Sequence, residues 1–483
     1  MLIKIIILKT PNLSLSEALL PIIILVVLLT YNVTIFGEDA LSGSNQFILL
    51  LGAFVSGLVG IRNKVSYGQM LHKVGKNLQS VMGPILILFF VGALAGTWLL
   101  SGIIPAMIDY GLQIANPRYF LSTCVLICAL VSLATGSSWS TSATIGIALI
   151  GIGKALGLPI GMVAGALISG AYFGDKLSPL SDTTNLAPAI AGGELFTHIR
   201  YMIYTTIPSI VITLILFTLL GWNFSASGEV ETQALSQTIR EKFNITPWLF
   251  IVPAAVILMI VKKTPPLLAL FTGTLLGVIF ALIFQSELLI EMSGSEKLNF
   301  NTVYKSILNS ITVGTEIKTN DPLLSELFTS EGMQGMLETI WLIICAMVFG
   351  GVMEAIGALK AISNAFLKWA KNTFELILGT AASSLTVNLT ASDQYLAIVV
   401  PGKMFAQAFK DRKLAPENLS RTLEDAGTVT SVLVPWNTCG AYQSGVLGVG
   451  VAEYFIYALF NLISPLMTLF YAYFNIKIKK IKY

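Results

Sequence analysis

Charged residues are scarce in this chain: only 11% of its 483 residues are Asp, Glu, Lys or Arg, whereas 55% are hydrophobic. Soluble domains carry charge on roughly a quarter of their residues, so this composition cannot cover a water-exposed surface. The net charge of +3 is also too small to indicate a nucleic-acid partner. The expected partner is instead the lipid bilayer.

Cysteine and histidine are also scarce, and neither forms a motif. The two histidines, His72 and His198, lie far apart, and no CxxC pair occurs. The four cysteines lie in or beside apolar segments, where small buried side chains are expected: Cys124, Cys128, Cys345 and Cys439. We therefore expect no zinc site, no disulfide framework and no bound cofactor, and a transporter in preference to an enzyme.

Long apolar runs are what the sequence has in abundance. They are about 17–22 residues long, which is enough for a helix to cross the hydrocarbon core of a membrane. The plainest runs cover residues 22–36, 85–104, 201–220, 267–284 and 455–474. Lys4 and Lys9 precede the first run without a small-residue cleavage site after it, which indicates an uncleaved first span. The sequence predicts an all-α polytopic membrane protein.

The basic residues between apolar runs indicate how the chain threads the membrane, because Lys and Arg are retained in cytoplasmic loops. Basic loops occur at Arg62–Lys76, Lys262–Lys263, Lys360–Lys371, Lys410–Lys413 and Lys477–Lys482. The connections 37–45, 221–246 and 285–334 are acidic or neutral and are expected outside. This pattern predicts about fourteen membrane-entering segments and cytoplasmic N- and C-termini.

Two halves of the chain resemble each other at an offset of 255 or 256 residues. Gly102 aligns with Gly357, Pro179 with Pro435, and the segment 135–137 with 390–392. Each half is predicted to hold five membrane segments, and an odd number makes the repeats antiparallel, an arrangement that recurs in transporters with broken helices. The predicted organisation is two helices in 1–79, repeat one in 80–221, connecting spans and an outside loop in 222–334, repeat two in 335–475, and a basic tail in 476–483.

Two polar breaks lie at matched positions of these repeats. The first, 134–142, interrupts an apolar hairpin with Thr135, Ser137 and Ser138, and it has no basic residue at its tip. Such a re-entrant hairpin would offer hydroxyls, carbonyls and helix ends to a ligand; close packing through small residues is the alternative. The second break, 389–394, adds the carboxylate of Asp393.

Two further polar stretches contain most of the acidic residues found within apolar surroundings, where each charge is costly. In 170–187, Gly174 and Pro179 interrupt the helix. The oxygen-bearing side chains around that break are Asp175, Ser178, Ser181, Asp182, Thr183 and Asn185, a set that suits a hard cation such as Na⁺. The stretch 419–440 supplies Glu424, Asp425, Asn437 and Thr438.

Charge partners are also expected from spacing in these two stretches. Lys176 follows Asp175 directly, and Arg421 lies four residues before Asp425 on the same predicted helix face. These pairings would leave Asp182, Asp393 and Glu424 as the candidate Na⁺ ligands and titrating groups.

Three segments carry a resemblance to a known family. GDKLSPLSDTTNLAP (174–188), TASDQYLAIVVPG (390–402) and LSRTLEDAGTVTSVLVPWNTCGAYQSGVLG (419–448) resemble the signature segments of the NhaC-type Na⁺/H⁺ antiporter family. The similarity extends over most of residues 20–475. The resemblance implies a secondary antiporter of the ion-transporter superfamily that moves Na⁺ and H⁺ across the bacterial inner membrane.

We therefore expect Na⁺/H⁺ exchange by alternating access, with oligomerisation left open. The same resemblance leaves open an organic-anion exchanger of the malate/lactate type, in which Arg421 or Lys403 would hold a carboxylate, or an amino-acid transporter. A channel and an intramembrane hydrolase are weaker alternatives. Ser137 and Asp175 could serve a hydrolase, but neither histidine has the context of a general base.

Overall fold

The computed structural model describes residues 13–36, 40, 42–224, 229–293 and 299–481. The expected basic residues Lys4, Lys9 and Lys482 lie outside these ranges. The described chain is almost entirely helical, with one short antiparallel pair, β1 (Thr315–Glu316) and β2 (Thr329–Ser330). The expected all-α membrane fold is confirmed.

The N-terminal part and the first predicted repeat contain eleven α-helices. They are α1 (Leu15–Phe36), α2 (Ser44–Arg62), α3 (Tyr67–Ser80), α4 (Met82–Leu100), α5 (Ile103–Ile114), α6 (Pro117–Thr135), α7 (Ser138–Thr141), α8 (Ile147–Ala155), α9 (Ile160–Leu177), α10 (Asp182–Ala191) and α11 (Leu195–Gly221). A π-helical turn, Ser142–Gly146, joins α7 to α8.

The connecting part holds α12 (Glu229–Lys242), α13 (Ile251–Val261), α14 (Pro266–Phe284), α15 (Ser286–Ser293), α16 (Phe300–Thr312), α17 (Pro322–Leu327) and α18 (Gly332–Gly335). The last part holds α19 (Leu337–Ala355), α20 (Ala358–Trp369), α21 (Thr373–Thr390), α22 (Gln394–Asp411), α23 (Pro416–Leu423), α24 (Thr438–Leu447), α25 (Val451–Tyr454) and α26 (Leu459–Tyr473). A π-helical turn, Glu424–Thr428, follows α23.

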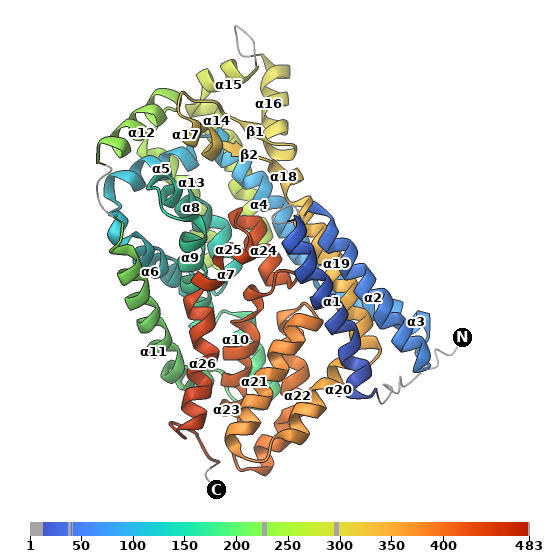
Figure 1. The fold of residues 1–483 in the computed structure, drawn as a ribbon. Coiled ribbons are helices and arrows are strands. Elements are labelled where there is room, and N and C mark those ends of the chain that lie inside the picture. Colours follow the sequence, from blue (N-terminus) through green and yellow to red (C-terminus); the bar gives the residue numbers. More distant parts are fainter. Residues whose placement is uncertain (1–12, 37–39, 41, 225–228, 294–298, 482–483) are drawn as a thin grey trace.

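Seven of the described helices are long and apolar enough to cross a membrane, or nine if each of two bent helix pairs counts as one span. This number is smaller than the fourteen predicted membrane-entering segments, because several of those segments consist of short helices separated by breaks. Figure 1 shows these short pieces, among them α7, α10 and α24, in the middle of the molecule between the longer helices.

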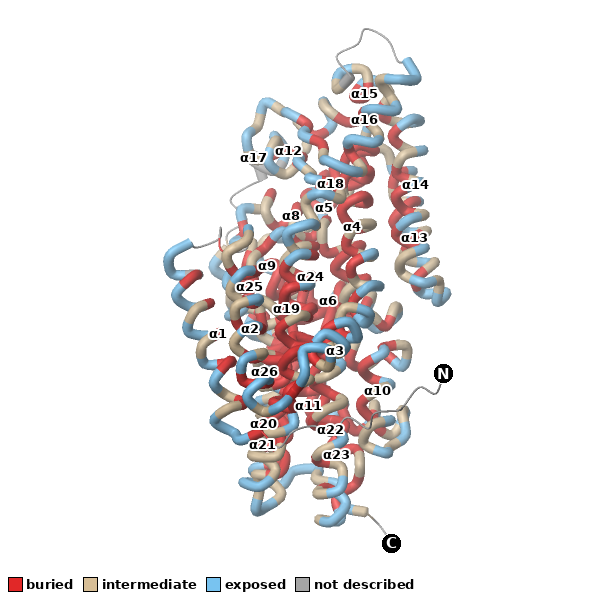
Figure 2. The backbone as a smooth tube through the Cα atoms, turned by 90° about the vertical axis from the view of Figure 1, so that its right-hand side faces the viewer, coloured by how far each residue is buried: buried red, intermediate tan, exposed pale blue. Residues whose placement is uncertain are grey.

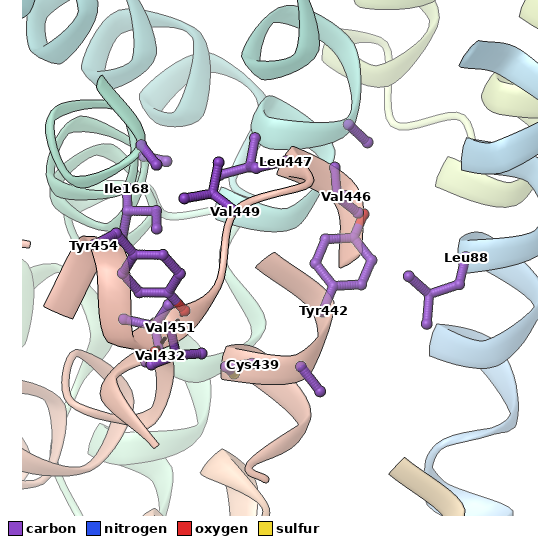
Figure 3. Packing of buried hydrophobic residues seen from close by; sticks show 14 of the residues in the cluster. Leu88, Ile168, Val432, Cys439, Tyr442, Val446, Leu447, Val449, Val451 and Tyr454 are labelled. Carbon is purple, nitrogen blue, oxygen red and sulfur yellow. Dashed lines mark hydrogen bonds between the residues drawn. The ribbon is translucent and has the colours of Figure 1, made fainter. Parts of the chain in front are cut away.

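Buried residues run through the interior of the bundle (Figure 2). Large apolar side chains are exposed on membrane-capable helices such as α1 and α11. Tyr454 and Tyr442 are large, fully buried side chains of the main apolar cluster (Figure 3). The Tyr454 hydroxyl donates to the carbonyl of Val432 at 2.8 Å, which satisfies the polar end of a buried ring.

Helix α9 packs directly on α6 because glycines face it. A Cβ at Gly170 would lie 2.2 Å from the Val125 carbonyl oxygen, and one at Gly174 would lie 2.3 Å from that of Ala129. Small residues at such spacing let two membrane helices approach backbone to backbone. The contact fixes the C-terminal end of α9, where Asp175 and Lys176 lie.

Candidate ion-binding site

Three broken segments and the start of α24 line one cavity of about 610 Å³, here called the carboxylate cavity. It is bounded by the α6–α7, α9–α10 and α21–α22 breaks, by the start of α24, by the start of α4, and by the α13–α14 turn at Lys263. The predicted site residues on its wall are Thr135, Ser137, Asp175, Ser181, Asp182, Thr183, Asp393 and Thr438. The polar breaks identified in the sequence therefore lie around one space.

Asp175 faces the cavity from the end of α9 and is held by the first break. Its Oδ2 accepts hydrogen bonds from the Ser138 amide at 3.1 Å and from the Ser138 hydroxyl at 2.7 Å. Its Oδ1 is buried and has no hydrogen-bond partner among the residues that the structure describes. Gly136 ends α6 at φ +72, a conformation that favours glycine, and Ser137 caps α7. One carboxylate oxygen is thus fixed by the first break, and the other makes no hydrogen bond to the described part of the protein.

Asp393 faces the same cavity as the N-cap of α22. Its Oδ1 accepts from the Leu396 amide at 2.8 Å, and the residue is only 5% exposed. Ser392, directly before it, has a left-handed backbone with φ +58. The Ser392 carbonyl accepts from the Thr438 amide at 3.0 Å, so the second break and the start of α24 are joined.

Asp182 lies in the first turn of α10, after the N-cap Ser181, and is exposed on the cavity wall. Ser178 and Asn185 brace this break instead of lining it. The Ser178 hydroxyl accepts from the Leu180 amide at 3.3 Å, and the Asn185 side chain donates to the carbonyls of Pro179 and Ser181. Asn437 has a similar role: it caps α24 and donates to Asn388.

Glu424 and Asp425 do not line the carboxylate cavity. They begin the π-helical turn after α23, and both are fully buried. Neither Glu424 oxygen has a hydrogen-bond partner within the described residues, although Lys176, Asp175 and Thr183 are nearby. Single π-turns inside helices are frequent at functional sites.

The expected charge partners were wrong. Lys176 pairs with Asp425 and not with Asp175, and both side chains of that pair are 0% exposed. Arg421 does not pair with Asp425: its guanidinium lies 4.5 Å from the ring centroid of Tyr201, and its nitrogens have no hydrogen-bond partner in the described structure. Sequence spacing did not decide the pairing, because Asp425 is met by Lys176 of α9, a helix distant in the sequence.

Hydroxyl groups from two other helices complete the surroundings of Asp425. Its carboxylate accepts from Thr205 of α11 at 3.0 Å, from Ser464 of α26 at 2.9 Å, and from Thr468 of α26. We call Lys176, Asp425, Thr205, Ser464 and Thr468 the buried ion-pair cluster. The sequence reading missed these hydroxyls. The spacing of Ser464 and Thr468, four apart on one face of an apolar helix, could have indicated them.

A second cavity of about 890 Å³ lies on the other side of α24. We call it the glutamate cavity, because Glu326, Glu331, Glu338 and Glu453 line it together with Lys154. Thr438 at the start of α24 lines the first cavity, whereas Ala441, Ser444 and Gly445 on the same helix line the second. Trp139, on the wall of the carboxylate cavity, stacks on Tyr442 at a ring-centroid distance of 4.0 Å. Helix α24 and this aromatic stack therefore separate the two cavities.

No three carboxylate, imidazole or thiolate groups within the described ranges come together as a metal-binding cluster. A cation in the carboxylate cavity would therefore be held by one or two carboxylates together with neutral oxygens. Hydroxyl and carbonyl oxygens are suitable ligands for a hard, singly charged cation.

The apolar helices and the polar cavity enclosed by broken segments define a multi-pass membrane transporter. Comparison with known proteins gives the family. The sequence profile of the Na⁺/H⁺ antiporter family matches residues 170–476, and the chain belongs to that family.

Similar proteins with assigned names cover nearly the whole chain. The Na⁺/H⁺ antiporter NhaC of Alkalihalophilus pseudofirmus is 35% identical over 90% of this chain and 93% of its own length. The malate-2H⁺/Na⁺-lactate antiporter of Bacillus subtilis is 34% identical, covering 89% of each chain. The arginine/ornithine antiporter ArcD of Halobacterium salinarum is 31% identical over 94% of this chain and 90% of its own length.

Proposed function

We propose that this protein exchanges Na⁺ for H⁺ across the bacterial inner membrane and that the carboxylate cavity is where both ions bind. The observation that carries the proposal is the convergence of Asp175, Asp182 and Asp393 from broken segments on one polar cavity. Family membership supports the choice of ions, since one of the similar antiporters is named for Na⁺ and H⁺.

Within the cavity, Asp175 and Asp393 are the proposed ion ligands. Each has one oxygen fixed by hydrogen bonds, to Ser138 and to the Leu396 amide, so the carboxylates are held in place before an ion arrives. A carboxylate binds either a cation or a proton, because the ligand must be deprotonated to coordinate a metal ion. Competition between the two ions at the same oxygens couples their movements.

Asp182 and Glu424 have different proposed roles, because their environments differ. Asp182 is exposed on the cavity wall, where it attracts cations toward the deeper carboxylates. Glu424 is fully buried, with Asp175 and Lys176 nearby. We assign it to proton binding, because burial away from water disfavours a charged carboxylate.

The two cavities support an alternating-access mechanism. Lys263, on the wall of the carboxylate cavity, belongs to a loop predicted to be cytoplasmic, which would make this cavity the inner entrance. The glutamate cavity would be the outer one, with α24 and the Trp139–Tyr442 stack between them. A local rearrangement of α24 would then expose the ion site to the other side.

Matched local geometry supports the proposed repeats. Helices α4 and α19 both have 19 residues, and α5 and α20 both have 12. Gly102 and Gly357 precede the shorter helices with φ +77 and +79, a backbone conformation that favours glycine. Asn116 and Asn372 then cap α6 and α21.

Reconstituted protein in liposomes with an imposed pH gradient tests the function. Addition of external Na⁺ should dissipate the gradient, as read from a trapped pH-sensitive dye, with saturation at rising Na⁺ concentration. Liposomes without protein and liposomes containing Asp175→Asn plus Asp393→Asn should show only the passive leak. Dissipation by the double variant at the wild-type rate would contradict the assigned site.

Exchange of a carboxylate-bearing substrate is a second candidate function, because Arg421 is a buried guanidinium without an acidic partner in the described structure. A guanidinium suits bidentate binding of a carboxylate, and similar antiporters are named for malate and lactate or for arginine and ornithine. Malate or arginine, supplied in place of Na⁺ in the same assay, distinguishes the candidates. Uptake of a labelled organic substrate that is lost in Arg421→Lys would favour the second.

A further inference from the structure

A basic pocket of about 410 Å³ lies away from both cavities, between the N-terminal end of α11 and the chain after α26. Its wall is formed by Thr197, Arg200, Tyr201 and Tyr204 of α11 and by the tail residues Lys477, Ile478 and Lys479. Helices α11 and α26 pack together, and the C-terminus lies near their ends (Figure 1). Three cations and two tyrosines in one pocket form a surface for a small anion.

The tail is held in place by specific hydrogen bonds. The Tyr201 hydroxyl donates to the Lys477 carbonyl and also contacts Asn418. The Ala415 amide donates to the Lys479 carbonyl at 2.9 Å, and Asn418 donates to the same carbonyl at 2.7 Å. Lys477 adopts a left-handed backbone with φ +49, which is unfavourable for a residue with a Cβ. The pocket is therefore an ordered part of the fold.

Two of the three cations have no acidic partner. Lys479 pairs with Glu417 at 2.5 Å, whereas Arg200 and Lys477 form no ion pair within the described residues. The Lys477 ammonium lies 4.9 Å from the ring centroid of Tyr204. Glu194 interacts electrostatically with Arg200 without forming an ion pair, and it accepts from Thr197 as the N-cap of α11. The pocket keeps an excess of positive charge.

The apolar surface beside the pocket indicates the kind of anion. Helix α11 is a membrane-capable helix, and its side chains beyond Tyr204 are exposed at Ile207, Val211 and Ile215. These positions follow one another at helical spacing and form a lipid-facing stripe. Leu466 and Phe470 of α26 are also exposed. A molecule with its anionic end at Arg200 and Lys477 could lay acyl chains along this stripe.

We propose that this pocket binds the phosphate headgroup of an anionic phospholipid, with Arg200 and Lys477 contacting the phosphate and the apolar stripe of α11 contacting the acyl chains. Basic pockets between membrane helices near the cytoplasmic surface bind such headgroups. Tyr201 forms part of the pocket wall and stacks on Arg421, which lies three residues before Glu424. A headgroup bound in the pocket would therefore contact Tyr201, whose ring packs on Arg421 close to the buried Glu424.

Thermal unfolding of the purified full-length protein tests the proposal without depending on transport. Phosphatidylglycerol titrated into detergent should raise the unfolding midpoint, and phosphatidylcholine should not. Arg200→Gln plus Lys477→Gln should weaken the apparent phosphatidylglycerol affinity about thirtyfold, because each basic residue near an anionic membrane surface contributes about fivefold. Both residues are exposed, so the variant should fold in detergent alone.

The matched control removes the same amount of charge outside the pocket. Lys360→Gln plus Lys368→Gln changes two exposed lysines of α20 that do not line it, and it should keep wild-type lipid affinity. Equal weakening in both double variants would overturn the proposal, because the effect would then be unspecific surface charge. Stabilisation by inorganic phosphate equal to that by phosphatidylglycerol would also overturn it, since the pocket would then recognise a free anion.

Discussion

Asp175 and Lys176 are neighbours at the end of α9, yet they face two different environments. Asp175 lines the carboxylate cavity, and in the described part of the chain one of its oxygens has no hydrogen-bond partner. Lys176 points into the buried ion-pair cluster, where Asp425 and Ser464 surround its ammonium group. One region places carboxylates on the wall of a cavity, and the other satisfies its charges internally.

Charged residues that look alike in the sequence therefore fall into two groups. Those on the cavity wall are placed to bind an ion, and those in the buried ion pair stabilise the fold. A carboxylate on a cavity wall can bind or release an ion at low free-energy cost, because water and hydroxyl groups take the place of the departing ion. A fully buried ion pair cannot, since removal of either member leaves an uncompensated charge. Substitutions in the two regions should therefore fail in different ways.

The largest effect is expected from Asp425→Ala. The change leaves the Lys176 ammonium buried without its partner, and breaking a buried pair costs about 3–5 kcal/mol. We expect loss of folded protein, measured as the monodisperse fraction after detergent extraction. Lys176→Met combined with Asp425→Leu removes both charges and should recover much of the folded protein. If Asp425→Ala alone extracted as well as wild type, the cluster would not be structural.

Asp175→Asn should reduce transport and leave stability nearly unchanged, in contrast to Asp425→Ala. The amide keeps the size of the carboxylate and is less costly to bury, so the unfolding midpoint should be close to wild type. Na⁺-dependent dissipation of a pH gradient should fall by at least about tenfold, equivalent to about 1.4 kcal/mol. Asp411→Asn, an exposed acid outside the cavity, is the control and should transport normally. Normal transport by Asp175→Asn would remove this residue from the site.

Gly174→Val tests whether the close packing of α9 on α6 fixes the positions of Asp175 and Lys176. Any Cβ at this position meets the Ala129 carbonyl oxygen at 2.3 Å, and overpacking of this kind costs about 1–3 kcal/mol. We expect a lower unfolding midpoint together with weaker Na⁺ affinity, because Asp175 moves with the helix. Gly157→Ala is the comparison: there φ is +69 but no heavy atom lies within 4 Å of an added Cβ, so a fall in stability without a change in Na⁺ affinity is expected.

The smallest effect is expected from Ser178→Ala. Its hydroxyl accepts one long hydrogen bond, from the Leu180 amide at 3.3 Å, and a typical hydrogen bond contributes about 0.5–1.5 kcal/mol. Na⁺ affinity should change by no more than a few-fold, as measured from the Na⁺ concentration for half-maximal exchange. A complete loss of exchange would show that this hydroxyl binds the ion directly.

The sequence predicted the class of fold and the acidic residues on the wall of the carboxylate cavity, for a physical reason. Apolar runs of membrane length must form helices, and polar residues inside them require a compensating role. Thr135, Asp175, Asp182 and Asp393 were identified in this way, and they line one cavity.

The pairing of charges could not be predicted, because it depends on contacts between segments distant in the sequence. Lys176 and Asp425 are 249 residues apart, and Arg421 lies instead over the ring of Tyr201 on α11. Local spacing suggested the wrong partners. The Trp139–Tyr442 stack was missed for the same reason, since its two rings come from different halves of the chain.

Proton release on Na⁺ binding tests the central claim most directly. Purified protein in weakly buffered detergent solution, titrated with NaCl and followed with a pH indicator, should release protons in a saturable way, with choline chloride as the salt control. The account predicts that Asp175→Asn plus Asp393→Asn abolishes this release, while Asp411→Asn preserves it. Undiminished, saturable proton release from the double variant would contradict the claim that Na⁺ and H⁺ compete for the carboxylates of this cavity.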